Sequence, residues 1–117
     1  MKTIKFTKVN RDELAVLQSE LLHYSNIQRL GLHHWGIDEF LNALIAVDTA
    51  HRLWISLRKK LESDSEAFIL TFSISEAVIV FKCCYWLRDG RTDYQKLIAG
   101  KYKNNIDEQL KSLTPGQ

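Results

Sequence analysis

The chain has 117 residues, of which 45% are hydrophobic and 26% are charged, and its formal net charge is +2. This profile is that of one globular domain, 1–117, which is long enough to fold without a metal or a disulfide. The charge is too small to argue for a nucleic-acid partner or an acidic membrane surface, and no apolar segment is long enough to span a bilayer.

The first elements are a short strand and a helix. Residues 3–9 alternate apolar and polar side chains, which predicts a β-strand. Asn10 is followed three residues later by Glu13, the spacing of a capping box, so we expect a helix over 11–24 and a connection from 25 to 36. The apolar stripe of this helix consists of Leu14, Leu17, Leu21 and Tyr24.

A longer helix is predicted over 37–62, which contains no Gly or Pro. Three cations, at 58–60, lie near its carboxyl end and complement the helix dipole. We expect its core-facing stripe to consist of Ile37, Phe40, Leu41, Leu44, Val47 and Ile55.

Residues 67–75 alternate again, with Phe68, Leu70 and Phe72 on one side. The pattern favours a second strand over about 68–74, and the alternative is the first part of a longer helix. The next stretch, about 76–88, is apolar on almost every side, and we expect it to be the central helix of the domain.

A last helix is predicted after Thr92, which forms a capping-box pattern with Gln95. The predicted fold is therefore α+β and mainly helical. Four helices form a cluster around the central helix 76–88, and one or two short strands, at 3–9 and 68–74, cover one end. An all-α four-helix bundle is the alternative.

Three polar residues of the second helix fall on or beside its predicted core-facing stripe. Asp48, His51 and Arg52 are expected to form a buried polar cluster with a structural role, because a buried carboxylate needs a partner. The alternative is an acid–base or metal pair made by Asp48 and His51, since residues at i and i+3 share one face of a helix.

The spacing Glu20-Leu-Leu-His23 is found in carboxylate-bridged di-iron bundles, and Asp48-Thr-Ala-His51 is a relaxed version of it. The predicted first helix turns Glu20 and His23 away from its apolar stripe, so we expect no metal site and no cofactor. The adjacent Cys83 and Cys84 are too close to form a disulfide with each other and are expected to be reduced and buried.

Two places are candidate binding sites. The run His33, His34 and Trp35 lies in the predicted connection, where Trp35 serves either as a partner-binding anchor or as a lid on the core. Trp86 belongs to the other place, the side of the central helix that it shares with Ile79 and Cys83, which we expect the other helices to leave partly uncovered.

The sequence contains no organised catalytic set, so it favours a non-enzymatic, cytoplasmic binding or regulatory protein that acts through protein contacts. We expect a homodimer in which the central helix or its neighbours line the contact, with no membrane partner. Two alternatives remain: a weak nucleic-acid binder that uses the basic C-terminal half, and an enzyme centred on Asp48 and His51.

Overall fold

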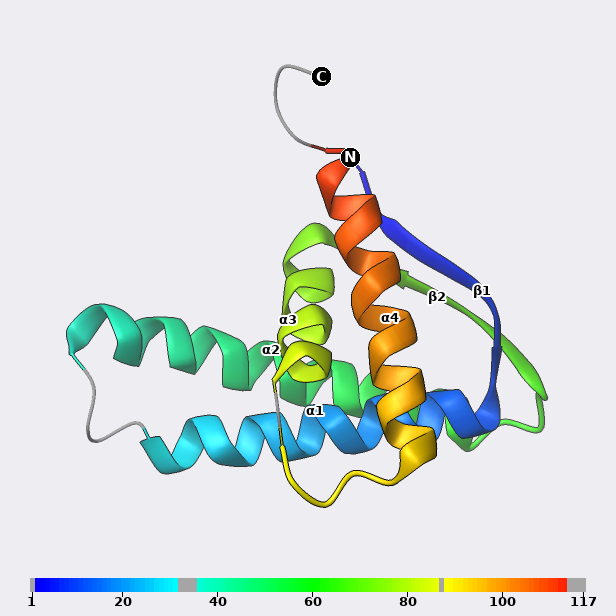
Figure 1. Cartoon of the computed structure of the whole chain (residues 1–117), viewed down its shortest axis with the longest axis horizontal. Helices are drawn as coiled ribbons and strands as arrows, with labels where there is room; N and C mark the ends of the chain where they lie inside the picture. The colour runs from blue at the N-terminus through cyan, green and yellow to red at the C-terminus, as the bar shows by residue number, and fades with distance from the viewer. Residues whose placement is uncertain (1, 32–35, 87, 114–117) are drawn as a thin grey trace.

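The structure is a computed structural model that describes residues 2–31, 36–86 and 88–113. Four helices and two strands make it a mainly helical α+β fold, as the sequence predicted (Figure 1). The elements in chain order are β1 (Ile4–Asn10), α1 (Arg11–Gly31), α2 (Ile37–Leu61), β2 (Ala67–Phe72), α3 (Ile74–Tyr85) and α4 (Asp93–Lys111).

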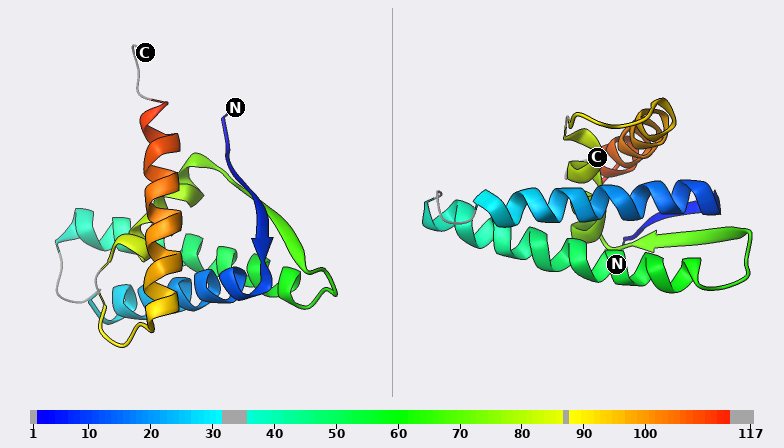
Figure 2. Two further views of the ribbon diagram at one scale, coloured as in Figure 1. Left: turned by 45° about the vertical axis from the view of Figure 1, so that its right-hand side comes forward. Right: turned by 90° about the horizontal axis from the view of Figure 1, so that it is seen from below.

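Helices α1 and α2 form a long antiparallel pair whose far ends extend beyond α3 (Figures 1 and 2). The sheet, α3 and α4 lie on one side of this pair. Helix α1 is longer than predicted, because 25–30 contains no Gly or Pro and the helix continues along α2 as far as Gly31. The expected connection at 25–36 is therefore wrong over its first half.

The two strands pair antiparallel, which settles the choice at 67–75 in favour of a strand. Phe6 pairs with Leu70 and Val9 with Phe68, so β1 uses one residue more than β2 between these pairs. The extra residue forms a bulge in which Lys8 has a φ of +58°. The bulge returns Val9 to the inner face, beside the buried Ile4 and Phe6 of the same strand.

Helix α3 occupies the centre, as predicted, and contacts all three other helices and β2. It begins two residues earlier than expected, and the Ser73 side chain caps it by accepting a hydrogen bond from the Glu76 N–H over 3.2 Å. The core closes where Phe6 of β1 packs on Tyr102 of α4, with 4.7 Å between the ring centroids. The described residues of α3 that are fully buried are Ala77, Ile79, Val80, Cys83 and Cys84.

Candidate functional site

Helix α2 turns the opposite face to the core from the one that the sequence predicted. Its buried residues are mostly small, with Ala43, Ala46 and Ala50 in the half that lies along α1. Small side chains let two helices approach closely, and this decided which stripe faces inward. The predicted stripe is wrong for this reason, and the fully buried residues are Ala43, Ala46, Ala50, Leu53 and Leu57.

The large apolar residues of α2 therefore lie on its outer side. Ile55 is 38% exposed and Ile37 is 70% exposed, and the other three fall between these values. In the right panel of Figure 2, α2 lies at the edge of the molecule with its outer side turned away from α1 and α4. The exposed large apolar residues of α2 are Ile37, Leu41, Leu44, Ile45 and Ile55.

All of these residues except Ile45 belong to a regular pattern, which we call the outer seam. Alternating steps of four and three residues place one residue per turn along the same side of a helix, as in a coiled coil. Ile45, Val47 and Trp54 border the seam on its two sides. The outer seam consists of Ile37, Leu41, Leu44, Asp48, His51, Ile55 and Arg58.

The polar residues at the middle of the seam are on the surface. The expected buried cluster of Asp48, His51 and Arg52 is therefore wrong: all three are exposed. Asp48 and Arg52 form an ion pair one turn apart, and their side chains are 59% and 75% exposed, respectively. The cause of the error is the same as for the stripe, since these residues do share a face with the large apolar residues, but that face is outside.

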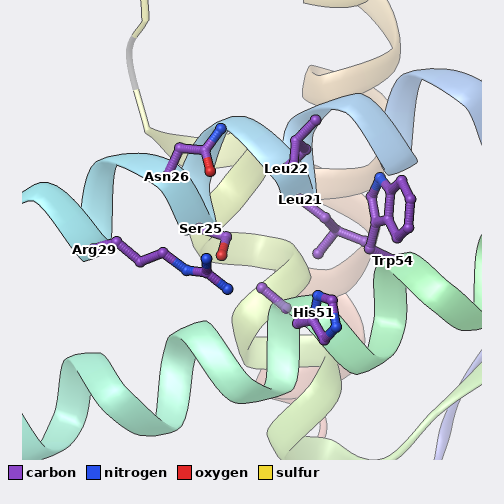
Figure 3. Close-up of a pocket in the computed structure, with 8 residues that line it drawn as sticks. Leu21, Leu22, Ser25, Asn26, Arg29, His51 and Trp54 are labelled. Carbon is purple, nitrogen blue, oxygen red and sulfur yellow. The ribbon is translucent and has the colours of Figure 1, made fainter.

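A pocket of about 230 Å3 lies in the groove between α1 and α2, beside the outer seam (Figure 3). Arg29 of α1 reaches across one end of it, and Trp54 of α2 forms the other end. His51 belongs both to this pocket and to the seam. The Trp54 ring also lies under the guanidinium of Arg58, 5.5 Å from the ring centroid. An aromatic residue, Trp54, and a cationic one, Arg29, therefore lie beside the apolar residues of the outer seam.

The structure describes one of the two binding sites that the sequence predicted. His33, His34 and Trp35 lie outside the described residues. Trp86 caps the carboxyl end of α3, and its ring meets Tyr24 edge-on at a centroid distance of 6.3 Å. The expectation that Ile79 and Cys83 are uncovered is wrong, because both are buried beneath neighbouring elements. The expected dimer contact on α3 is therefore not an exposed surface.

Two buried carboxylates were not predicted. Glu20 is 1% exposed and accepts hydrogen bonds from Arg88, at 3.2 Å from Nε, and from Arg91. Glu13 accepts from Lys101 at 2.7 Å and from the hydroxyl of Tyr102 at 3.1 Å. The partners of Glu20 lie about 70 residues away in the chain, so local periodicity gave no sign of them.

Both carboxylates are satisfied and serve to join α1 to the α3–α4 part of the molecule. His23 is exposed, as predicted, whereas the expectation that Glu20 is turned outward is wrong. Over 2–31, 36–86 and 88–113, no three His, Cys, Asp or Glu residues are grouped so that they could hold a metal ion.

The two cysteines are free, buried thiols, as expected. Burial raises the pKa of the Cys84 thiol to about 12, and the nearby Glu20 adds to this effect. Burial likewise raises the pKa of Cys83 well above its ordinary value, with further contributions from Cys84 and Glu20. Since the thiolate is the reactive form, neither residue is suited to nucleophilic or redox chemistry.

Within the described residues, no helix combines the length and the apolar character needed to cross a membrane. Comparison of the chain with protein-family models, with curated proteins and with solved structures gives no match.

Proposed function

We propose that this chain is a protein-interaction module that pairs with a second copy of itself through the outer seam of α2. The observation that supports the proposal is that α2 has two apolar sides, of which the fold uses one. The inner side packs on α1 and α3, while the outer side leaves its large aliphatic residues exposed. Large aliphatic residues left exposed along one side of a helix in a small protein are typical of an interaction site.

The spacing of the seam suits a partner helix. Residues repeated at alternating steps of four and three insert between those of a second helix with the same pattern. Leu41 and Leu44 supply the apolar contacts on one side of the middle of the seam, and Ile55 supplies them on the other. A second copy carries the same residues at the same spacing, so the seam meets the geometric requirement for self-pairing.

Charge favours an antiparallel pair. Asp48 and His51 lie at equal distances from the midpoint between Thr49 and Ala50, which is also the midpoint of the part of the seam from Leu41 to Arg58. When two copies run in opposite directions about this midpoint, Asp48 of each copy lies opposite His51 of the other. Arg52, one residue further on, supplies a positive charge near each carboxylate, and the His51 ring can donate a hydrogen bond to it. A parallel pair would instead place the two copies of Asp48 against each other, which is unfavourable.

The same register matches the apolar residues. Leu44 and Ile55 also lie at equal distances from the midpoint, so Leu44 of each copy packs against Ile55 of the other. Leu41 lies opposite Arg58, whose aliphatic stem can cover it while the guanidinium stays on Trp54. The surface is therefore complementary to itself about a two-fold axis, as a homodimer contact must be.

The oligomeric state tests the proposal. Light scattering and sedimentation across a concentration series should show the wild-type chain approaching twice its monomer mass of 13.6 kDa. Leu44→Asp should shift the protein to monomer, because it introduces a charge at the centre of the contact. Leu97→Asp is the matched control, since Leu97 is 67% exposed on α4 and should leave the dimer unchanged.

Two results would contradict the proposal. One is a wild-type mass that stays at the monomer value up to millimolar concentration. The other is an equal response to Leu44→Asp and Leu97→Asp, which would show that the seam has no special role.

A charge-exchange series tests the direction of the pair. Asp48→Lys should weaken the dimer because it places a lysine near Arg52 of the other copy, and His51→Glu should weaken it because it places a glutamate opposite Asp48. The double variant Asp48→Lys/His51→Glu should restore it in the antiparallel arrangement, where the introduced lysine of each copy would face the introduced glutamate of the other. In a parallel arrangement the double variant would remain weak, and the antiparallel register would be rejected while the contact itself stands.

A further inference from the structure

A second pocket lies where α1, α3 and α4 meet, on a different part of the molecule from the outer seam. Its volume is about 690 Å3, and we call it the three-helix pocket. Size alone makes it comparable to pockets that bind small molecules. The residues that line it are Tyr24 and Gln28 of α1, Lys82 and Tyr85 of α3, Trp86 at the end of α3, and Lys103 of α4.

The pocket has an aromatic wall. The rings of Phe81 and Tyr85 stack at a centroid distance of 5.7 Å and an interplanar angle of 15°, and Tyr85 is 64% exposed. On the α1 side, Tyr24 supports Trp86 edge-on. Tyr85 thus presents a largely exposed ring that Phe81 supports, and a planar group can stack on it where the flexible Lys103 side chain moves aside.

The charge of the pocket is of one sign. Lys82 and Lys103 both line it, and none of its described lining residues carries a carboxylate. Neither lysine forms an ion pair in the described part of the chain, whereas Lys101, two residues from Lys103, pairs with Glu13. Lys103 Nζ lies 5.9 Å from the centroid of the Tyr85 ring, so a cation and the open aromatic surface are close together.

An adjoining pocket shares Tyr24, Gln28 and Lys82 and includes one acidic residue, Glu39. The Glu39 carboxylate already accepts a hydrogen bond from the Gly36 N–H at 2.9 Å, where it caps α2. Among the described residues, Glu39 forms no ion pair with Lys82 or Lys103. The remaining polar groups of the pocket are the Gln28 amide, the Tyr24 hydroxyl and the Trp86 N–H, all of which can donate hydrogen bonds.

We propose that the three-helix pocket binds a planar aromatic ligand that carries a phosphate group. The ring would stack on Tyr85, and the phosphate would accept charge-assisted hydrogen bonds from Lys82 and Lys103. The Gln28 amide and the Trp86 N–H would donate hydrogen bonds to the polar edge of the ligand ring. A free mononucleotide and a nucleotide within a single strand share this chemistry, and the experiment separates the two sources.

Titration calorimetry and NMR on the full chain test the proposal, with adenosine monophosphate, adenosine and a six-residue oligoadenylate as probes. Adenosine monophosphate should bind in a saturable manner and shift the signals of Tyr85 and Trp86. Adenosine should bind about tenfold more weakly or worse, because it lacks the phosphate. Binding should be independent of self-association, so Leu44→Asp should retain it.

Variants identify the site. Lys82→Gln and Lys103→Gln should each weaken binding of adenosine monophosphate by about tenfold. Tyr85→Leu should weaken adenosine and its monophosphate alike, since it removes the stacking surface. Lys5→Gln, on the exposed side of β1, is the charge-matched control and should have no effect. All of the altered side chains are at least partly exposed, so circular dichroism should show an unchanged fold.

The outcomes are distinct. Binding of the monophosphate identifies a free nucleotide as sufficient, and binding of the oligonucleotide without the monophosphate assigns the pocket to a single strand. The proposal is overturned if no probe binds at millimolar concentration, if adenosine binds as well as its monophosphate, or if Lys5→Gln weakens binding as much as Lys103→Gln.

Discussion

At the scale of single residues, Glu20 is the most deeply buried polar side chain in the part of the chain that the structure describes. The Arg88 and Arg91 side chains that bind it are 10% and 6% exposed, so all three members of the cluster are nearly removed from water. Arg91 also donates to the carbonyl oxygen of Cys83 at 2.9 Å and so fixes the loop after α3. The cluster ties the middle of α1 to the connection between α3 and α4.

Glu20→Gln should therefore lower the free energy of unfolding by about 3 kcal/mol, because it leaves two buried guanidinium groups without a carboxylate. Urea denaturation monitored by circular dichroism measures the change. Asp107→Ala is the control: it removes an exposed ion pair with Lys111, outside the outer seam, and should change the stability by less than about 1 kcal/mol. Equal losses in the free energy of unfolding in the two variants would contradict the buried ion pairs of Glu20 with Arg88 and Arg91.

Lys8 offers a second residue-scale prediction. Its φ of +58° costs a non-glycine residue about 1 kcal/mol, and glycine avoids this cost. Lys8→Gly should therefore stabilise the protein by several tenths of a kcal/mol, after the greater flexibility of the unfolded glycine chain is taken into account. Lys5→Gly, in the regular part of β1, should instead destabilise it. A loss of stability in both variants would argue against the bulge.

At the scale of elements, α4 contains a glycine that its conformation does not require. A Cβ at Gly100 would meet no atom within 4 Å outside the backbone of its own helix. Gly100→Ala should therefore raise the free energy of unfolding by about 0.8 kcal/mol through helix propensity. Thermal unfolding of the two proteins checks this, and a destabilised variant would place another element against this side of α4.

Helix α2 shows how far an element can be predicted without its neighbours. The length of the helix and its charged ends were predictable, because they depend on local propensity and on the absence of Gly and Pro. The direction of its faces was not, because both sides have apolar residues at helical spacing. The inner side was decided by α1, which packs against Ala43, Ala46 and Ala50. The same choice placed Asp48 and His51 on the surface.

At the scale of the whole molecule, the pH dependence of stability follows from buried acids. Burial raises the pKa of Cys84 to about 12, and burial together with Cys83 raises that of Tyr24 to about 12. Burial also raises the pKa of Tyr102, with Glu13 as the next contribution. Each group keeps its proton in the folded state at a pH where the unfolded chain has lost it.

The stabilisation from these groups is complete below the pKa of an unfolded cysteine, about 8.5, and is lost as the pH rises toward 12. The free energy of unfolding should therefore fall above pH 9, by about 1.4 kcal/mol per pH unit for each group that titrates only in the unfolded state. Urea denaturation between pH 7 and pH 10.5 measures the slope.

Cys84→Ala removes one of the titrating groups, so the free energy of unfolding should fall less steeply with pH above pH 9, by the contribution of up to one group. The substitution also leaves a small cavity, which lowers stability at every pH. A wild-type stability that is constant from pH 8 to pH 10.5 would contradict the assignment of buried neutral thiols.

The sequence by itself determined the class of fold and most of its elements. A capping residue such as Thr92 fixes a helix start locally, and the alternation in 67–75 sets the face of a strand, so these features need no knowledge of the rest of the chain. The central position of α3 followed from composition alone, since a helix that is apolar on nearly every side must be covered.

Which residues lie on the surface, in the core or around a pocket was decided only by the tertiary structure. Which stripe of α2 is free, why Glu20 is buried, and how Lys82, Tyr85 and Lys103 come to line one pocket all depend on contacts between elements far apart in the chain. Such contacts are set by packing and by long-range pairing of charges, and neither leaves a periodic signal in the residues that take part. The expected contact on α3 was misplaced because neighbouring elements cover Ile79 and Cys83.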